Sequence, residues 1–244
     1  MKPPFQPTRA HQAMQMAAAA YMSDMSLVKQ CFPSAESIEY ISDRGTDTQV
    51  LCVAWKDVSY CAFRGTQFSE NWSTVDVLRN TKFRKVLWGF PGTGVRAHRG
   101  YAAAVDSVAG KLKDWLFVQR SMNRQAVCTG HSMGGVEASG AALLLEFDAT
   151  YTFGAPRFGN KAFAKQIETR NVFRVVHESD IAPSYPHKWL GYRHAGQRWQ
   201  LSREGGYSRI DGDTKDFYHY PYLQGKADHK PIQYLEASKK GHFV

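Results

Sequence analysis

The feature that most constrains this chain is the segment TGHSMGG, residues 129–135, between a short apolar run and a long stretch of good helix formers. RQAVCTG has the composition of a short buried strand, and VEASGAALLLEF predicts a helix that packs on its small and apolar side. A strand, G-x-S-x-G and a helix form the arrangement of a nucleophile elbow, which holds a serine on a strained turn. The sequence therefore predicts that Ser132 is an exposed nucleophile, although the five-residue motif alone also fits an ordinary glycine-rich loop.

The two elbow glycines have a steric reason. Gly130 and Gly134 lie two residues on either side of Ser132, where a Cβ atom would collide as the strand and the helix cross. The turn also opens a helix, whose first backbone N–H groups have no partner within the helix and can stabilise an oxyanion. The N–H of Met133, directly after the nucleophile, is the expected donor.

A second segment, TQVLCVAWKDVSYCAFRGTQ, predicts a β-hairpin in which two β-rich runs join at Lys56 and Asp57. The hairpin ends in Gly65 and Thr66. A strand that ends in a glycine and a small hydroxyl residue can present a further N–H, and a threonine Oγ, to the same oxyanion. Taken alone, this segment also fits an ordinary turn after a strand.

A serine nucleophile needs a histidine base and a carboxylate that orients the histidine, in the chain order serine, acid, histidine for this kind of elbow. NVFRVV predicts a strand that runs into HESDIAPSYP, so Asp180 lies just past the C-terminal end of a strand. Glu178 is the competing acid because it is two residues away. Three further acids sit in a polar loop and are expected to be solvated: Asp211, Asp213 and Asp216.

Eight segments between about residues 45 and 238 carry a family resemblance: AFRGTQ, NWSTVDV, AHRGY, CTGHSMGG, YTFGAPRFGN, VVHESDIAPSYP, GYRHAG and DHKPIQYLEA. In this order they resemble the fungal-type class 3 lipases, which are α/β hydrolases and include triacylglycerol lipases, plant phospholipases A1 and feruloyl esterases. The resemblance implies one α/β-hydrolase domain over 1–244, with a central, mostly parallel sheet flanked by helices on both faces and a short lid-like segment. Residues 1–7 are expected to be flexible.

The resemblance also implies site residues. Thr66 and Met133 would supply the oxyanion hole, and the stretch from Gly154 to Arg157 would shape the turn after the next strand. His194 lies in a family block where the histidine has no catalytic role. The family places its catalytic histidine before a terminal helix that bears a tyrosine, which matches His229. His219 remains the alternative base.

Two segments bear on the substrate. QFSENWSTVDVL keeps Trp72 at the position of the tryptophan in the family's lid but is otherwise polar, so a strongly apolar inner lid face is not evident. LRNTKFRKVLWGFPG interleaves aromatic residues, Phe83 and Trp88 among them, with basic residues. The basic residues are Arg79, Lys82, Arg84 and Lys85. Each basic residue near an anionic membrane contributes about 1 kcal/mol of binding, and aromatic side chains favour the headgroup region.

The second segment therefore suggests a loop that docks on anionic phospholipid and feeds an acyl chain to Ser132. Trp72, Phe83 and Trp88 are the candidate lid or substrate-binding residues. A solvated surface strand with ordinary core aromatics fits this segment equally well.

Composition narrows the function. The chain has 244 residues and a net charge of +9, without a helix-turn-helix, zinc-finger or RNA-recognition pattern, so no nucleic-acid partner is expected. Neither a signal-peptide core nor a membrane-spanning stretch is evident. The four cysteines lack metal-ligand spacing and are expected to be buried free thiols, which favours a reducing, cytoplasmic location.

The resulting expectation is a serine ester hydrolase, a lipase acting on triacylglycerol or phospholipid esters through Ser132, Asp180 and His229. It needs no metal and no organic cofactor. A short-chain or feruloyl-type esterase is the alternative, and so is a catalytically silent lipid-binding relative.

Overall fold

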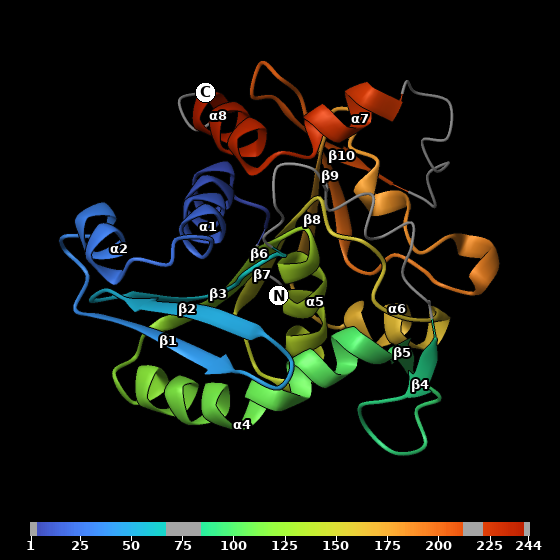
Figure 1. Cartoon of the computed structure of the whole chain (residues 1–244), viewed down its shortest axis with the longest axis horizontal. Helices are drawn as coiled ribbons and strands as arrows, with labels where there is room; N and C mark the ends of the chain where they lie inside the picture. The colour runs from blue at the N-terminus through green and yellow to red at the C-terminus, as the bar shows by residue number, and fades with distance from the viewer. Residues whose placement is uncertain (1–3, 67–83, 212–221, 242–244) are drawn as a thin grey trace.

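The protein is described by a computed structural model over residues 4–66, 84–211 and 222–241. A central eight-stranded sheet has the order β1-β2-β3-β6-β7-β8-β9-β10 (Figure 1). Neighbouring strands from β3 to β9 run parallel, whereas β1, β2 and β10 join antiparallel. The strands are β1 (Ser37–Asp43), β2 (Thr48–Ala54), β3 (Val58–Phe63), β6 (Gln125–His131), β7 (Ala149–Phe153), β8 (Val172–His177), β9 (Gln197–Leu201) and β10 (Tyr207–Ile210).

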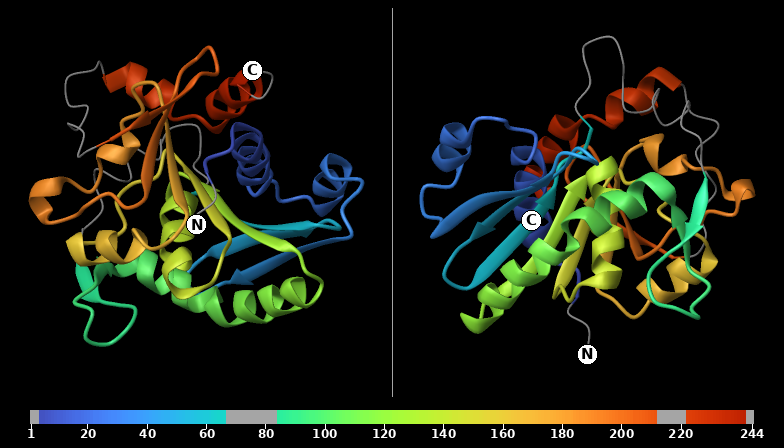
Figure 2. Two further views of the ribbon diagram at one scale, coloured as in Figure 1. Left: turned by 180° about the vertical axis from the view of Figure 1, so that it is seen from behind. Right: turned by 60° about the horizontal axis from the view of Figure 1, so that its bottom comes forward.

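Helices cover both faces of this sheet (Figures 1 and 2). One face carries α4 (Arg99–Ser121), α5 (Met133–Leu144) and α6 (Lys161–Ile167). The other carries α1 (Pro7–Ala19), α2 (Met25–Cys31) and α8 (Pro231–Gly241). Helix α7 (Tyr222–Asp228) precedes α8, two 3-10 turns cover Ala182–Ser184 (η1) and Lys188–Leu190 (η2), and β4 (Lys85–Leu87) pairs with β5 (Arg96–His98) outside the sheet. The predicted α/β-hydrolase fold is confirmed, whereas the predicted lid-like segment lies outside the described residues.

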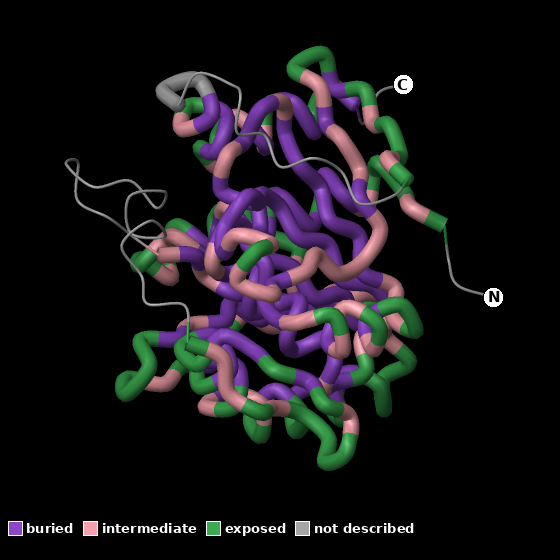
Figure 3. The backbone as a smooth tube through the Cα atoms, turned by 90° about the vertical axis from the view of Figure 1, so that its right-hand side faces the viewer, coloured by how far each residue is buried: buried purple, intermediate pink, exposed green. Residues whose placement is uncertain are grey.

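The sheet separates two apolar cores because its strands alternate. In β2, Val50 and Cys52 belong to the core under α4 and α5, whereas Leu51 and Val53 belong to the core under α1. Strands β2 and β3 form the predicted hairpin. The central strands are buried along their length, and exposed residues gather on the outer helices and loops (Figure 3). This rigid layer presents the C-terminal strand ends at one edge, where parallel sheets build their sites.

The cysteines fit the expectation of free thiols in three cases of four. Cys52, Cys61 and Cys128 occupy aligned positions on β2, β3 and β6 and are fully buried. Cys31 is free as well, but it lies exposed at the end of α2. The prediction of burial is therefore wrong for Cys31.

Part of the segment expected to be flexible packs on the sheet. The ring of Phe5 stacks on Trp199 with the centroids 4.0 Å apart, and its edge meets Phe173 at 5.5 Å. Helix α1 begins directly after this anchor, at Pro7. The anchor and the helix together place the N-terminal segment against the face that also carries α8.

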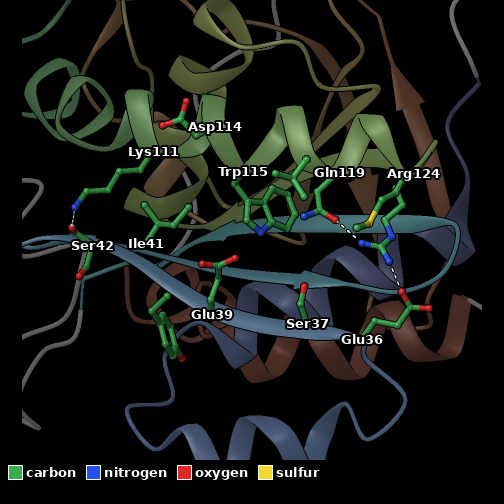
Figure 4. Close-up of a pocket in the computed structure, with 13 residues that line it drawn as sticks. Glu36, Ser37, Glu39, Ile41, Ser42, Lys111, Asp114, Trp115, Gln119 and Arg124 are labelled. Atoms are coloured by element: carbon green, nitrogen blue, oxygen red, sulfur yellow. Dashed lines mark hydrogen bonds and ion pairs between the residues drawn. The ribbon is translucent and has the colours of Figure 1, made fainter.

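Strand β1 forms one edge of the sheet, next to α4. A groove of about 750 Å³ lies between this strand and α4 (Figure 4). Lys111 donates a hydrogen bond across it to the carbonyl oxygen of Ser42, at 3.0 Å, and Arg124 pairs with Glu36 (Figure 4). A charged side chain that binds an edge strand discourages pairing with another chain, so Lys111 protects part of this edge.

Within the parts of the chain that the structure describes, no helix is both long and apolar enough to cross a membrane.

Candidate active site

Ser132 forms the turn between β6 and α5. Its backbone has φ 58° and ψ −123°, a strained conformation for a residue with a side chain. A Cβ atom on Gly134 would lie 2.1 Å from the carbonyl oxygen of Phe63, and one on Gly130 would lie 2.3 Å from the backbone of Gly134. The crossing of strand and helix therefore requires both glycines. Ser132 is fully buried, unlike the exposed nucleophile that the motif predicts.

Three side chains from distant parts of the chain meet at this turn. Nε2 of His229 lies 3.0 Å from Oγ of Ser132, and Nδ1 of His229 lies 2.9 Å from Oδ2 of Asp180. His229 is 5% exposed and Asp180 is 0% exposed. The arrangement allows the serine to donate to Nε2 while Nδ1–H donates to the carboxylate, which is the geometry of nucleophile, base and orienting acid.

Asp180 is held by neutral donors as well as by the histidine. Its Oδ1 accepts from the N–H of Ala182 at 2.8 Å, and its Oδ2 accepts from the hydroxyl of Tyr234 at 2.6 Å. The competing acid, Glu178, instead accepts from the N–H of Arg203 at 2.6 Å. The structure thus brings Asp180, and not Glu178, to the histidine.

Gly154, at the end of β7, makes room for this pair. Its φ is +57°, and a Cβ atom there would lie 2.5 Å from Oδ2 of Asp180 and 3.0 Å from Nδ1 of His229. A side chain would therefore push the acid and the base apart. The family resemblance places Gly154 in a turn, and the structure adds that this turn borders the hydrogen bond between the two groups.

The expected oxyanion groups also lie at the elbow. Met133 is the first residue of α5, so its N–H has no carbonyl one turn earlier in the helix to bind. Thr66 follows β3, and its hydroxyl points to the sulfur of Met133. Both residues therefore border the space beside Ser132, where a tetrahedral oxyanion would form.

Two polar residues of the site escaped sequence reasoning. His131 precedes the nucleophile within the motif itself and contacts the backbone of His229. Tyr21 follows α1 and binds His131. The position of His131 within the elbow motif could have identified it from sequence. Nothing in the sequence around Tyr21 distinguishes this residue from a core tyrosine.

Trp88 does not border the candidate nucleophile. Its indole N–H donates to Oδ1 of Asp106 on α4 at 2.9 Å. The next residue, Gly89, lies against Leu143, where a Cβ atom would be 3.5 Å from the side chain. Leu143 is near the C-terminal end of α5, about 16 Å along the helix from Ser132. These contacts place the Trp88 ring beside α4 and Phe158, and its contact with substrate stays a prediction.

Seven residues considered in the sequence lie outside the described residues: Trp72, Arg79, Lys82, Phe83, Asp213, Asp216 and His219.

Comparison with known proteins supports a common origin. Residues 60–189 match the family model described as lipase (class 3). The secreted mono- and diacylglycerol lipase 1 of Fusarium solani is 35% identical over 152 residues, covering 59% of this chain and 43% of that protein. The phospholipase A1-II 5 of Oryza sativa subsp. indica is 29% identical over 205 residues, covering 69% of this chain and 43% of that protein. The chain thus spans less than half the length of these two relatives.

Solved structures agree on the fold. A crystal structure of MDLA from Penicillium cyclopium has a TM-score of 0.75 at 23% identity and covers 94% of this chain and 97% of that chain. The family model includes the elbow and Asp180 but ends before His229. The geometry of the described residues therefore supplies what the family match leaves out.

Proposed function

The chain belongs to the class 3 lipases, and from this membership we propose that it is a serine ester hydrolase that cleaves acyl esters of glycerolipids. The observation that carries the proposal is the hydrogen-bonded line from Ser132 through His229 to Asp180, with distances of 3.0 and 2.9 Å, on a strained elbow. The relatives named mono- and diacylglycerol lipase and phospholipase A1 support a glycerolipid ester as the substrate class.

In the first half of the proposed reaction, His229 takes the hydroxyl proton of Ser132 as Oγ forms a bond to the ester carbonyl carbon. Asp180 keeps the proton of the imidazole on Nδ1 and stabilises the imidazolium. The N–H of Met133 and the groups of Thr66 stabilise the oxyanion, and losing one such donor costs about 10²–10³ in turnover. The imidazolium then protonates the leaving alcohol as the ester C–O bond breaks.

In the second half, water enters in place of the alcohol. His229 removes a proton from the water, whose oxygen attacks the acyl carbon. Collapse of this intermediate returns the proton from His229 to Oγ of Ser132 and releases the fatty acid. The steps draw on the chain's own groups, water and the substrate alone.

The experiment measures hydrolysis of p-nitrophenyl esters from short to long acyl chains, with and without anionic liposomes. Ser132→Ala should lower turnover by about 10⁶, as removal of a triad nucleophile does elsewhere. Ser139→Ala is the matched control, because this serine lies on α5, two turns after Ser132, and its hydroxyl donates to the carbonyl of Gly135 at 3.0 Å. Activity that equals the Ser132→Ala background on every ester would overturn the proposal. A preference for short soluble esters would instead favour an esterase.

The proposal extends to docking on an anionic membrane surface, through residues that differ in part from those suggested by the sequence. Arg84 is exposed, but Lys85 binds the carbonyl of Leu190 and lies 4.5 Å from the ring centroid of Tyr192. Burial and, to a lesser degree, nearby arginines lower the pKa of Lys85. Lys85 therefore ties β4 to the 3-10 turn η2 (Lys188–Leu190), instead of extending toward a membrane.

Exposed apolar side chains flank this tie. Trp189 is 78% exposed and Leu87 is 70% exposed, and both elements lie at the same side of the molecule (Figures 1 and 2). Together with Arg84 they form the surface that we assign to docking. Because the described part of this surface lies toward the far end of α5, the proposal covers docking and not delivery of the acyl chain to Ser132.

Replacing Trp189 and Leu87 with serine should weaken binding to anionic liposomes in a flotation assay. Phe117→Ser is the control, because Phe117 on α4 is 77% exposed but lies outside this surface. Equal binding of all variants would remove the docking surface.

A reducing compartment is also part of the proposal. Sγ of Cys52 and Sγ of Cys61 lie 3.8 Å apart as free thiols in the core, beside Cys128. The Fusarium solani relative is named as secreted, so location must be measured. Thiol titration of the denatured protein, isolated with alkylation at lysis, should find four free thiols, and fewer would favour an oxidising compartment.

A further inference from the structure

His131 connects the elbow to the backbone of the catalytic histidine. It is 1% exposed, and its Nε2 lies 2.8 Å from the carbonyl oxygen of His229. On the other side of the ring, Nδ1 lies 3.0 Å from the hydroxyl of Tyr21. The rings of His131 and His229 face each other with centroids 4.8 Å apart. His131 is therefore a bridge between the N-terminal segment and the base.

The partners of His131 determine its tautomer. A carbonyl oxygen can only accept, so Nε2 must carry a proton and donate it to His229. Burial, followed by the neighbouring His229, holds the pKa of His131 well below its usual value, so the ring is neutral and Nδ1 must accept. Burial raises the pKa of Tyr21, so its hydroxyl keeps the proton that Nδ1 receives. Tyr21 thus selects the tautomer that can bind the carbonyl.

His229 needs such a constraint because of where it lies. It stands at the turn between α7 and α8, and its own N–H reaches the carbonyl of Lys226 at 3.3 Å, a long hydrogen bond. Asp180 restrains the ring through Nδ1, and the backbone before His229 is held at Asp228, whose carbonyl oxygen lies 3.2 Å from Nδ1 of His177. The hydrogen bond from His131 restrains the carbonyl oxygen of His229. Together with the contact to Asp180, it directs Nε2 toward Ser132.

We propose that Tyr21 and His131 are positioning residues that hold the backbone carbonyl of His229 and so keep its imidazole in line with Ser132. The inference rests on the proposed function, since it assigns the means by which the base of that reaction is aimed. The family match over residues 60–189 includes His131 but neither Tyr21 nor His229.

The surroundings of Tyr21 are built for this contact. A Cβ atom on Gly65 would lie 1.9 Å from the Tyr21 hydroxyl and 2.7 Å from the carbonyl oxygen of His131. Only glycine at this position lets the phenol reach the imidazole. Tyr40 donates to the carbonyl of Met22 at 2.7 Å and so holds the chain directly after Tyr21.

Helix α1 ties the same segment to both partners of the bridge. Thr129 on β6 donates to the carbonyl of Ala13 at 3.1 Å, and His11 lies 3.0 Å from the hydroxyl of Ser238 on α8. The N-terminal segment therefore contacts the strand before Ser132 and the helix after His229 at once. A shift of this segment would reach the site through Tyr21.

The test compares His131→Leu with His131→Gln in steady-state ester hydrolysis. The leucine variant removes the donor to His229, and kcat should fall by about 10- to 100-fold with KM unchanged, because misplacing a catalytic group by about 1 Å costs up to about 10². Glutamine offers an amide N–H near the position of Nε2, so it should restore kcat to within about threefold of the wild type. Equal kcat in all three proteins would overturn the proposal, and so would equal loss in both variants at unchanged melting temperature.

Tyr21→Phe should lower kcat by about three- to tenfold, because the ring can then adopt the wrong tautomer. Tyr60→Phe is the matched control, since it removes a phenol hydroxyl that donates to the side chain of Gln12 on α1 at 3.0 Å and does not bind His131, and its kcat should not change. In the His131→Gln background, Tyr21→Phe should have little effect, since no tautomer remains to be selected. Additive effects of the two substitutions on kcat would contradict the proposal that Tyr21 acts through His131.

A readout without turnover separates this inference from the proposed function. If the wild type hydrolyses no ester, the proposed function fails, and ¹⁵N NMR of His131 still tests the bridge. The wild type should show protonated Nε2 and bare Nδ1, and Tyr21→Phe should shift the ring toward the other tautomer. Protonated Nδ1 in the wild type, or spectra that Tyr21→Phe leaves unchanged, would overturn the assignment.

Discussion

Ser132 and His229 share one hydrogen bond of 3.0 Å, yet the chain positions them by different means. Ser132 is held by its own segment, since β6 leads into it, α5 leads away from it, and glycines on both sides allow the crossing. His229 lies outside regular structure and is held by residues from three other places: Asp180, Tyr21 through His131, and Tyr234 through Asp180.

The two halves of the site should therefore be sensitive to different kinds of substitution. Backbone geometry positions Ser132, so adding one Cβ atom at an elbow glycine should displace it. Hydrogen bonds between distant segments position His229, so the loss of one hydroxyl should lower activity only in part.

The largest effect is expected at the elbow. Gly134→Ala would place a Cβ atom 2.1 Å from the carbonyl oxygen of Phe63, so α5 must move, and we expect a loss of about 3 kcal/mol or more in the free energy of unfolding. Gly110→Ala, in the middle of α4, meets no atom within 4 Å and should stabilise the protein by about 0.5–1 kcal/mol. Urea denaturation of both variants measures the pair, and shifts of the same sign would contradict the steric explanation.

On the histidine side, Tyr234→Phe removes the donor to the buried carboxylate of Asp180, at 2.6 Å, and the acceptor of the backbone N–H of His177, at 2.9 Å. Hydrogen bonds to charged groups contribute about 1.5–3 kcal/mol, so stability should fall by about 2 kcal/mol, and kcat should fall with it. Tyr60→Phe removes a hydroxyl that donates to the neutral amide of Gln12 at 3.0 Å and accepts from Arg9 at 3.4 Å, without a contact to a carboxylate, and should cost about 1 kcal/mol without a change in kcat. Equal losses of stability and of kcat in both variants would show that the charge of Asp180 is not what the hydroxyl stabilises.

A second buried carboxylate lies on the elbow helix and sharpens the contrast with Asp180. Burial raises the pKa of Glu137 from 4.5 to about 8, although Arg64 opposes the shift. Between these values the folded protein holds a proton that the unfolded chain has released, so stability falls as the pH rises from about 5 to 8.

Glu137→Gln should remove this slope, which approaches about 1.4 kcal/mol per pH unit at its steepest. Denaturation curves at pH 5, 7 and 9 measure it, with the wild type as the reference. Parallel pH profiles for the two proteins would mean that Glu137 titrates normally in the folded state.

The smallest effect concerns the strain at Ser132 itself. Glycine adopts positive φ without the penalty that a side chain carries, so Ser132→Gly should be more stable than Ser132→Ala by about 1 kcal/mol, while neither hydrolyses esters. Thermal melting of the two inactive variants measures the strain without interference from activity. A glycine variant that melts below the alanine variant would show that the elbow is unstrained.

The same contrast explains what could be predicted from sequence. The elbow was predictable because strand, glycines, serine and helix stand next to one another, and Asp180 was predictable because it directly follows a strand. In both cases the physical cause lies within a few residues. The fold class followed instead from the resemblance carried by the order of the family segments.

Other features depend on contacts across the fold, which composition and spacing do not encode. Tyr21 is a tyrosine at the end of an alanine-rich helix, and only the packing of that helix on β6 brings it to His131. Trp88 has the sequence context of a lipid-facing aromatic, but its ring meets Phe158 with centroids 4.9 Å apart. The burial of Ser132 likewise depends on segments far away in the chain.

The separation of 97 residues between Ser132 and His229 has a consequence for biosynthesis. A ribosome adds Ser132 well before it adds His229, so the growing chain holds the elbow sequence before it holds the base. The hydrogen-bonded line from Ser132 to Asp180 can therefore form only after residue 229 has been made, when α8 can pack beside α1.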